Sequence, residues 1–323
     1  MKNLSFFKSS VFFLLLGASS FAVSSCKKDD PAPAVPKTIA DVVIEGANFT
    51  LLKAALTKAG LVSTFQAAGT FTVFAPTDDA FKAAGLDQAA IDAASTTKET
   101  LAAVLKYHVL GAKVAAADIA TADNTVVATL NGSAFVTKNA AGVSINGAKV
   151  TTADVAASNG VIHVIDRVIL PSAGDVVATL QADANYSILV AAVIKAGLVS
   201  TLQGAGPFTV FAPNNAAFAA FAAPYNTAAG INGLTDPQIA TLKSVLLYHV
   251  VAGARVFSTN LKAGAVPTAL TGKSVTVSLD GGVKITGNAT TNVVNVVTSP
   301  VKAFNINASN GVIHTIDKVL SPL

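Results

Sequence analysis

Apolar residues recur at a helical spacing in two stretches of the chain, and each stretch ends on a histidine. The positions i, i+3, i+4 and i+7 are taken by Leu101, Val104, Leu105 and His108 in the first stretch and by Leu242, Val245, Leu246 and His249 in the second. A threonine precedes each stretch and is followed three residues later by Glu or Gln, as in Thr96 with Glu99 and Thr235 with Gln238. This pattern predicts two long helices that each begin with a capping box.

A shorter amphipathic helix is predicted before each long one. In the first, Asn48 is the candidate N-cap and Gly60 the terminator. Its apolar face consists of Phe49, Leu52 and Leu56. The same arrangement recurs between residues 185 and 197, with Asn185 as the cap, Gly197 as the terminator, and a face of Tyr186, Leu189 and Val193.

Between the two helices lies the run "FTVFA", at residues 71–75 and again at 208–212, which is apolar on both faces and stops at a proline. It predicts a short buried strand, and Thr77 and Asn214 are candidate caps of a brief helix after it. Beyond the long helices the period changes to two, in runs separated by the turn sequences Asn131-Gly132, Asn146-Gly147 and Asp280-Gly281-Gly282. These predict hairpins. Helices followed by hairpins predict an α+β fold with mostly antiparallel sheets.

These elements occur twice because the chain contains a repeat of domain size. "AGLVSTFQAAGTFTVFAPTDDAF" from Ala59 matches "AGLVSTLQGAGPFTVFAPNNAAF" from Ala196, and "NGVIHVIDRVILP" from Asn159 matches "NGVIHTIDKVLSP" from Asn310. The offset grows from one motif to the next, as expected of insertions in loops on a shared scaffold. We predict two tandem domains, residues 38–171 and 172–323.

The N-terminal segment has the layout of a secretory signal peptide, predicted for residues 1–25. Lys2 and Lys8 precede an apolar stretch, small residues follow, and Cys26 is the only cysteine of the chain. The alternative is an uncleaved membrane anchor. "VSSC" resembles the lipobox of bacterial lipoproteins, and the "KKDD" after it resembles the export tag of surface lipoproteins in the Bacteroidetes. This resemblance implies that Cys26 carries fatty acyl chains such as palmitate and attaches the chain to the outer membrane, facing outward. The proline-rich residues 26–37 are then a stiff tether.

Charge argues against one class of partner. The chain has 22 basic and 18 acidic residues, and two of the lysines lie in the leader. No long basic run follows, so a source of phosphate neutralisation is missing and nucleic-acid binding is not expected.

The four histidines are the candidates for chemistry: His108 and His249 on the helical stripes, and His163 and His314 on the last strand of each repeat. We predict that all four are packed parts of the core. The spacing gives no metal-binding set, and no cofactor is expected. Asp166 would project from the strand face opposite His163, and no G-x-S-x-G turn supports a nucleophilic serine. The adjacent carboxylates of Asp78 and Asp79 could suggest a catalytic pair, but the second copy has Asn214 and Asn215 near the matching positions. Both pairs can cap a helix, whereas asparagine cannot act as a catalytic acid or base. The sequence predicts a protein that is not an enzyme.

Three motifs, each found twice and in the same order, carry a family resemblance: "FTVFAP", "YHV" and "NGVIH" with its following Ile-Asp. Together they resemble the fasciclin domain. The resemblance implies a seven-stranded β-wedge or sandwich flanked by helices in each copy, used mostly in extracellular adhesion and matrix contact. It also implies candidate interaction residues at Tyr107, His108, Tyr248 and His249, since this region is associated with integrin binding in animal fasciclin domains. The two tyrosines lie beside the apolar stripe, within reach of the surface.

We therefore expect a non-catalytic adhesion or interaction protein at the cell surface. Its partner would be a cell-surface or matrix protein or a polysaccharide, besides the membrane that the lipid anchor enters. One alternative is a lipoprotein that binds a lipid or small apolar ligand, with the Phe-rich residues 216–225 lining the pocket; the competing interpretation of that stretch is a buried amphipathic helix. The other alternative is a polyester-type hydrolase, a role that some bacterial fasciclin proteins are thought to have.

Overall fold

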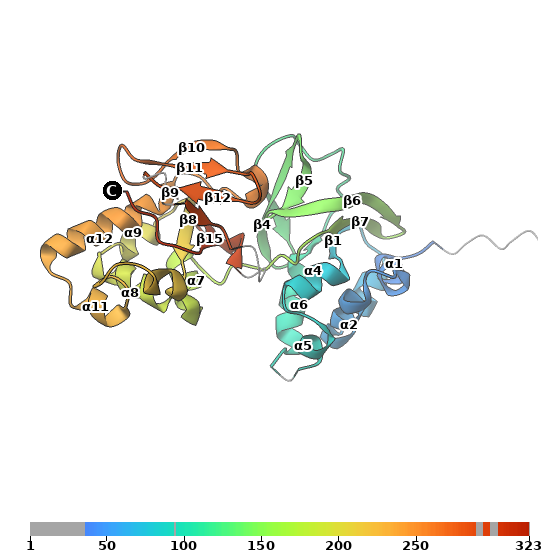
Figure 1. The fold of residues 1–323 in the computed structure, drawn as a ribbon. Coiled ribbons are helices and arrows are strands. Elements are labelled where there is room, and N and C mark those ends of the chain that lie inside the picture. The colour runs from blue at the N-terminus through green and yellow to red at the C-terminus, as the bar shows by residue number, and fades with distance from the viewer. Residues whose placement is uncertain (1–35, 94, 289–292, 298–302, 323) are drawn as a thin grey trace, which may run out of the picture. The chain divides into compact units, whose positions relative to one another are not determined.

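The computed structural model describes residues 36–93, 95–288, 293–297 and 303–322 (Figure 1). The leader, Cys26 and the tether up to Val35 lie outside the described residues. The described chain contains two successive sets of helices that are each followed by strands, which confirms the predicted α+β class. We refer to the segments before and after Pro171 as the first and second halves; the boundary itself stays a prediction.

The first half begins with helices and ends with strands. Its helices are α1 (Ile39–Glu45), α2 (Thr50–Ala59), α3 (Val62–Gln66), α4 (Asp78–Ala83), α5 (Gln88–Asp92) and α6 (Lys98–Tyr107). Its strands are β1 (Phe71–Pro76), β2 (Val109–Leu110), β3 (Thr125–Thr129), β4 (Gly132–Asn139), β5 (Gly142–Ile145), β6 (Ala148–Ala157) and β7 (Gly160–Ile165). These strands close into a barrel in the order β1 to β7.

The second half repeats the order with more elements. Its helices are α7 (Val176–Gln181), η1 (Ala184–Tyr186), α8 (Ser187–Lys195), α9 (Val199–Leu202), α10 (Asn215–Ala219), α11 (Ala228–Asn232), α12 (Asp236–Tyr248) and η2 (Ser258–Asn260). Its strands are β8 (Phe208–Pro213), β9 (Val250–Ala252), β10 (Gly264–Pro267), β11 (Ser274–Ser278), β12 (Lys284–Thr286), β13 (Val293–Asn295), β14 (Ile306–Ala308) and β15 (Gly311–Ile316). They form two four-stranded sheets, β14-β15-β8-β9 and β10-β11-β12-β13.

The sheets are mostly antiparallel, as predicted, and the described strands contain one parallel pair in each half. Strand β1 pairs with β7, and β8 with β15. A Cβ on Gly160 would lie 2.1 Å from the carbonyl oxygen of Phe71, and one on Gly311 would lie 2.6 Å from that of Phe208. The glycine of the repeated "NGVIH" motif is therefore needed where the two parallel strands approach each other. The predicted hairpins at Asn131-Gly132, Asn146-Gly147 and residues 280–282 are confirmed.

Two predicted caps of the short helices are wrong, and the real caps come from elsewhere in the chain. Asn48 and Asn185 do not cap α2 and α8. Instead, Oδ1 of Asp78 accepts a 2.8 Å hydrogen bond from the amide of Leu51 at the start of α2. Oδ1 of Asn215, the matching residue, accepts a 3.0 Å bond from the amide of Ile188 in α8. A neighbouring helix thus supplies the oxygen that satisfies a free amide of the first turn.

The caps of the other helices follow the sequence more closely. Thr77 and Asn214 cap α4 and α10 as predicted. At α12 the predicted capping box of Thr235 and Gln238 is confirmed, and the backbone amide and the hydroxyl of Thr235 both donate to Oε1 of Gln238, at 2.9 Å each. At α6 the prediction is off by one residue, because Thr97 rather than Thr96 accepts the amide of Thr100, at 3.2 Å. Glu99 is then one position too early to complete a box.

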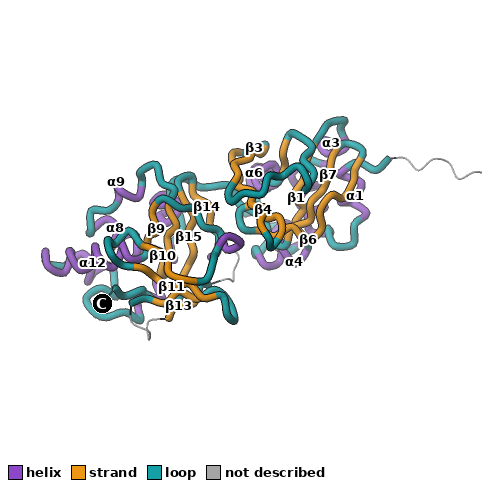
Figure 2. Tube along the Cα trace, turned by 90° about the horizontal axis from the view of Figure 1, so that it is seen from above, coloured by secondary structure: helices purple, strands orange, loops and turns teal. Residues whose placement is uncertain are grey.

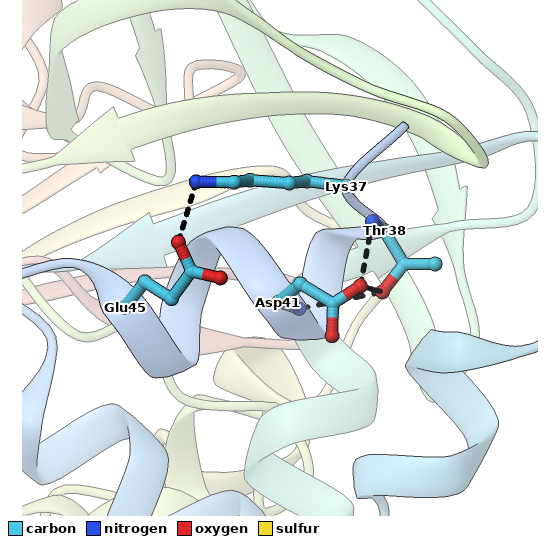
Figure 3. Close-up of polar contacts among 4 residues, drawn as sticks. All are labelled: Lys37, Thr38, Asp41 and Glu45. Atoms are coloured by element: carbon cyan, nitrogen blue, oxygen red, sulfur yellow. Dashed lines mark hydrogen bonds and ion pairs between the residues drawn. The ribbon is translucent and has the colours of Figure 1, made fainter. Parts of the chain in front are cut away.

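Helices α1 and α7 were not predicted. In α1 the amide of Thr38 donates to Oδ2 of Asp41 at 2.9 Å, and the amide of Asp41 donates back to the Thr38 hydroxyl at 3.3 Å (Figure 3). The Thr38 hydroxyl also donates to Oδ2 of Asp41, at 2.6 Å, and this bond, together with that from the Thr38 amide, lowers the pKa of the Asp41 carboxyl. Lys37 and Glu45 form an ion pair beside the helix. Helix α1 contacts α2, α3 and β7, and Figure 2 shows it beside α3 and β7.

Each half buries apolar cores of its own. One cluster of buried residues runs from Ile39 to Val168 and a second from Phe74 to Ile169. The clusters of the second half run from Val176 to Val319 and from Phe211 to Leu320. No buried member of these four clusters joins a cluster of the other half, as expected of tandem domains.

Candidate functional site

His108 follows the last residue of α6 and is only 3% exposed. Its Nδ1 lies 2.8 Å from the carbonyl oxygen of Val104, and its Nε2 accepts a 3.1 Å hydrogen bond from the amide of Ile169. Because a carbonyl oxygen can only accept, Nδ1 must carry the proton and the ring is neutral. The residue ties the end of α6 to the segment that follows β7.

His249 makes the same two contacts at the end of α12. Its Nδ1 lies 2.7 Å from the carbonyl oxygen of Val245, and its Nε2 accepts a 2.9 Å bond from the amide of Leu320. Burial lowers the pKa of both His108 and His249 to about 4, because a charged ring would lose its water. Neither ring has a nitrogen left for a partner, so both are structural residues in this fold.

The histidines of the last strands use the opposite tautomer. Nε2 of His163 donates to the carbonyl oxygen of Val114 at 2.9 Å, and its Nδ1 accepts from the amide of Asp154 at 3.2 Å. His314 bonds in the same way to Val256, at 2.8 Å, and to Asn305, at 3.4 Å. Burial also lowers the pKa of His314 to about 4. The prediction that the histidines are packed core residues agrees with all four environments.

The rest of the "NGVIH" motif is also occupied by backbone contacts. Oδ1 of Asn159 accepts from the amide of Ile39 at the start of α1, at 2.9 Å. Oδ1 of Asp166 accepts from the amide of Lys149 at 2.8 Å, so this carboxylate orients a strand and not His163. The second copy repeats these contacts through Asn310 with Val176 and Asp317 with Asn295. The side chains of the repeated motif therefore connect its strand to a helix and to a neighbouring strand through hydrogen bonds.

Tyr107 and Tyr248 do not reach the surface, which corrects the position expected from the helical phase. They are 1% and 0% exposed, respectively. Each hydroxyl donates to a backbone carbonyl at 2.8 Å, Tyr107 to Ser133 and Tyr248 to Ser274. Burial raises the pKa of both. Strands β3–β5 and β10–β12 cover the end of each long helix, a contact that a helical period cannot reveal. A role of Tyr107, His108, Tyr248 and His249 in partner binding stays a prediction, and in this fold none of the four is exposed.

Tyr107 has two further partners, which belong to a contact between the halves. Its hydroxyl accepts from Nδ2 of Asn146 at 2.8 Å and from Nδ2 of Asn307 at 3.0 Å. Asn146 lies in the first half and Asn307 in the second. Nδ2 of Asn124 also donates across the contact, to the carbonyl oxygen of Arg255 at 2.6 Å. The tyrosine of the first Tyr-His pair is therefore an interdomain residue.

Arg255 takes part in that contact through its carbonyl oxygen and is 8% exposed. Its guanidinium donates to Asn307, to the carbonyls of Ala308 and Ser309 at 2.8 and 2.9 Å, and to the carbonyl of Gly311. It also lies over the ring of Phe135, 4.0 Å from the centroid. Burial lowers the pKa of Arg255 to about 10. The sequence patterns did not point to this residue, because three of its four acceptors are backbone carbonyls around the β14–β15 turn.

Three cavities lie near these residues, and the one beside Arg255 and Asn124, of about 590 Å³, is wide open to solvent. The other two are more enclosed. One, of about 200 Å³, is formed between the segment after β7, helix α7 and the segment around β14, and Arg167 lies in its wall. The other, of about 80 Å³, lies inside the helical core of the second half and is lined almost entirely by apolar side chains, with His249 among the lining residues. Residues 216–225 line neither cavity; Phe218 is buried in the core, and Phe221 and Tyr225 pack against it.

The described residues give no support to a catalytic or metal centre. None of their histidines bonds to a serine hydroxyl, and no group of three or more His, Cys, Asp or Glu side chains is placed to hold a metal ion. Asp78 caps α2, and Asp79 lies near Lys82 on the surface, so the two carboxylates do not act as a pair. No helix in the described ranges is long and apolar enough to span a membrane.

The comparisons with known proteins agree with this architecture. The fasciclin domain model matches residues 47–171 and 184–322, so the chain belongs to the fasciclin-domain family and carries two such domains in tandem. Protein sll1483 of Synechocystis is 44% identical over 135 residues, which are 42% of this chain and 73% of that protein.

Mammalian relatives match both halves at lower identity. Transforming growth factor-beta-induced protein ig-h3 of Sus scrofa is 30% identical over 79% of this chain and 35% of its own length. Human periostin is 28% identical over 79% of this chain and 28% of its own. The chain thus spans well under half the length of either. Among solved structures, the domain pair of the insect cell adhesion molecule fasciclin I matches 84% of this chain and 95% of its own, with 19% identity and a TM-score of 0.41.

Proposed function

We propose that this protein is a non-catalytic adhesion or interaction protein of the cell surface, in which two tethered fasciclin domains contact another surface. The observation that carries the proposal is the state of the four histidines. Each is buried and bonded through both ring nitrogens to backbone groups, so none is available to move a proton or bind a metal. Family membership supports the same conclusion, since fasciclin domains are typically adhesion or interaction modules.

The proposal includes attachment to the outer membrane through a lipid on Cys26, with the domains facing outward. Its support is the lone cysteine after a leader-like segment, followed by a proline-rich stretch before the first helix. Cys26→Ser is expected to abolish labelling with a fatty-acid probe and to release the protein from membrane fractions. Retention of an unprocessed Cys26→Ser chain in the membrane would indicate an uncleaved anchor. Protease digestion of intact cells tests the outward orientation.

The partner is a cell-surface or matrix protein or a polysaccharide. Two domains on one chain gain avidity when both engage the same surface, so a weak contact for each is sufficient. Because Tyr107, His108, Tyr248 and His249 are buried, the contact surface is expected to lie elsewhere on the domains.

The test is attachment of cells that lack the gene, complemented with the wild type, with Cys26→Ser, or with Tyr248→Phe. Attachment is expected to fall on deletion and with Cys26→Ser, and to return with the wild type. Tyr248→Phe, which changes a buried hydroxyl, is the matched control and is expected to attach normally if it folds. Unaltered attachment of the deletion strain to several surfaces and partner cells would contradict the adhesion function.

The second candidate is a lipoprotein that binds an apolar ligand. The apolar cavity of about 80 Å³ in the second half favours it over the third, a polyester-type hydrolase. The hydrolase lacks support because no histidine in the described part of the chain bonds to a serine hydroxyl.

A further inference from the structure

The cavity beside Arg167, of about 200 Å³, has both an apolar wall and a cation. Leu180, Ile313 and Phe304 supply apolar surface, and all three are buried. Arg167 lies in the same wall, and its guanidinium is 5.5 Å from the centroid of the Phe304 ring. Ala173 also lines the cavity and is exposed, so the cavity meets solvent there.

Arg167 has a buried donor without an acceptor. Its Nη1 is enclosed and makes no hydrogen bond to any residue that the structure describes, and burial lowers the pKa of the guanidinium. Arg255 differs in this respect, because the two terminal nitrogens of its buried guanidinium donate to four acceptors. A buried guanidinium nitrogen without a partner is costly, and its fork geometry suits a carboxylate.

The other polar side chains of the cavity do not supply that acceptor. Asn146 and Asn307 are bonded to Tyr107, Asn305 to Ser258, and Tyr186 to Thr315. Asp166, the neighbour of Arg167, accepts the amide of Lys149. Asp183 lines the cavity, but no ion pair joins it to Arg167 among the described residues. The Arg167 side chain therefore lines a cavity whose other polar side chains are already paired.

The Tyr-His pair of the first half holds two walls of this cavity in place. His108 accepts the amide of Ile169, which lines it, and Tyr107 accepts from Asn146 and Asn307, which lie on opposite sides of the contact between the halves. A cavity built on fixed walls loses less entropy when a ligand enters.

We propose that this cavity is a binding site for a small organic carboxylate. The carboxylate accepts from the guanidinium of Arg167, and its apolar body lies against Leu180, Ile313 and Phe304. Since a dry protein cavity of about 150 Å³ can hold benzene, the volume suits a body of about six to ten carbon atoms. This site goes beyond the proposed adhesion function and is independent of it.

The test is titration calorimetry of the full chain with octanoate and, separately, with octanol, which has the same carbon body and no charge. Octanoate is expected to bind about tenfold or more tightly than octanol, as a charge-assisted hydrogen bond in a partly buried site predicts. Arg167→Gln is expected to remove this preference, with the affinity for octanol unchanged. The matched control is Lys318→Gln: Lys318 holds the position of Arg167 in the second motif copy, is exposed, and is expected to leave octanoate binding unchanged.

A second variant guards against misfolding of Arg167→Gln. Ala173→Phe adds a ring at an exposed position of the cavity mouth and is expected to weaken both probes at least tenfold while the melting temperature stays the same. Three results would overturn the proposal. The first is an equal affinity for octanoate and octanol. The second is acetate binding as tightly as octanoate, which would leave a simple anion site. The third is an absence of octanoate binding together with equal destabilisation by Arg167→Gln and Asp183→Asn, which would show that Arg167 pairs within the chain.

Discussion

The two tyrosines of the repeated Tyr-His pair have the same kind of backbone partner but different side-chain partners. Tyr107 donates to Ser133 and Tyr248 to Ser274, a residue at the same distance along the chain. Tyr107 also accepts from two asparagine amides, and one of them, Asn307, belongs to the second half. The motif is thus structural in both copies, and its surroundings have diverged where one half meets the other.

Two further pairs of matching positions show the same divergence. Arg167 lies in a cavity wall, whereas Lys318 is exposed. On the outer face of the first short helix, Lys53 and Thr57 of α2 correspond to Val190 and Ile194 of α8. Ile194 is 57% exposed, so the second half presents an apolar side chain where the first presents a hydroxyl.

Acidification is expected to cause the largest loss of stability, because it acts on both copies at once. Burial lowers the pKa of His108, His249 and His314 from 6.5 to about 4, so the folded state favours the neutral rings. Their contribution is present above pH 6.5 and is lost as the pH falls toward 4, by up to about 3 kcal/mol for each group. Urea unfolding at a series of pH values measures this. The slope of the free energy of unfolding against pH reports how many more protons the unfolded chain binds than the folded one. His249→Gln is expected to reduce this difference by at most one proton. An unchanged slope would contradict the lowered pKa of His249.

Replacing one histidine at a time compares its contribution to stability in the two copies of the motif. His108→Ala and His249→Ala each leave a carbonyl and an amide unpaired and open a cavity, which is expected to lower the free energy of unfolding by about 2–4 kcal/mol. Similar losses for both variants would show that the buried histidine contributes equally to stability in the two halves. A variant that melts normally but loses cell attachment would instead make that histidine a binding residue.

The tyrosines are expected to differ. Tyr248→Phe loses the bond to Ser274 and is expected to cost about 1 kcal/mol. Tyr107→Phe also leaves the Asn146 and Asn307 amides without their acceptor, so a cost of about 2–3 kcal/mol is expected. Urea unfolding of both variants gives the difference. Equal costs would mean that the contact between the halves contributes nothing through Tyr107, and a double variant with Asn307→Ala then tests the coupling directly.

The smallest effect is expected on the outer helix face. Ile194→Thr copies the residue of the first half into the second, and at an exposed position its effect on stability is expected to stay within about 0.5 kcal/mol. Thr57→Ile is the reciprocal variant. Thermal melts measure both, and a loss above about 1 kcal/mol for Ile194→Thr would show that Ile194 packs against a partner element.

Local sequence patterns were sufficient to predict many of the helices, strands and turns of this protein. The duplicated motifs, the α6 and α12 stripes, the buried strands ending at Pro76 and Pro213, and the Asn-Gly hairpins all depend on a period or a turn residue within a short window. The burial of the four histidines also follows from such a window, because the period alone places each one on an apolar face. Helices α1 and α7 were missed because each is a short helix with few turns to establish a period.

Only the tertiary structure decided which distant groups meet. Asp78 and Asn215 cap helices that precede them by many residues, and the tyrosine hydroxyls are covered by strands that come later in the chain. The sequence alone does not distinguish Arg255, which has four acceptors, from Arg167, whose Nη1 has none. A hydrogen bond is directional and short-ranged, so the pairing of such groups depends on how whole segments pack against one another. Hydrophobic period, in contrast, is a property of neighbouring residues and is visible before the chain folds.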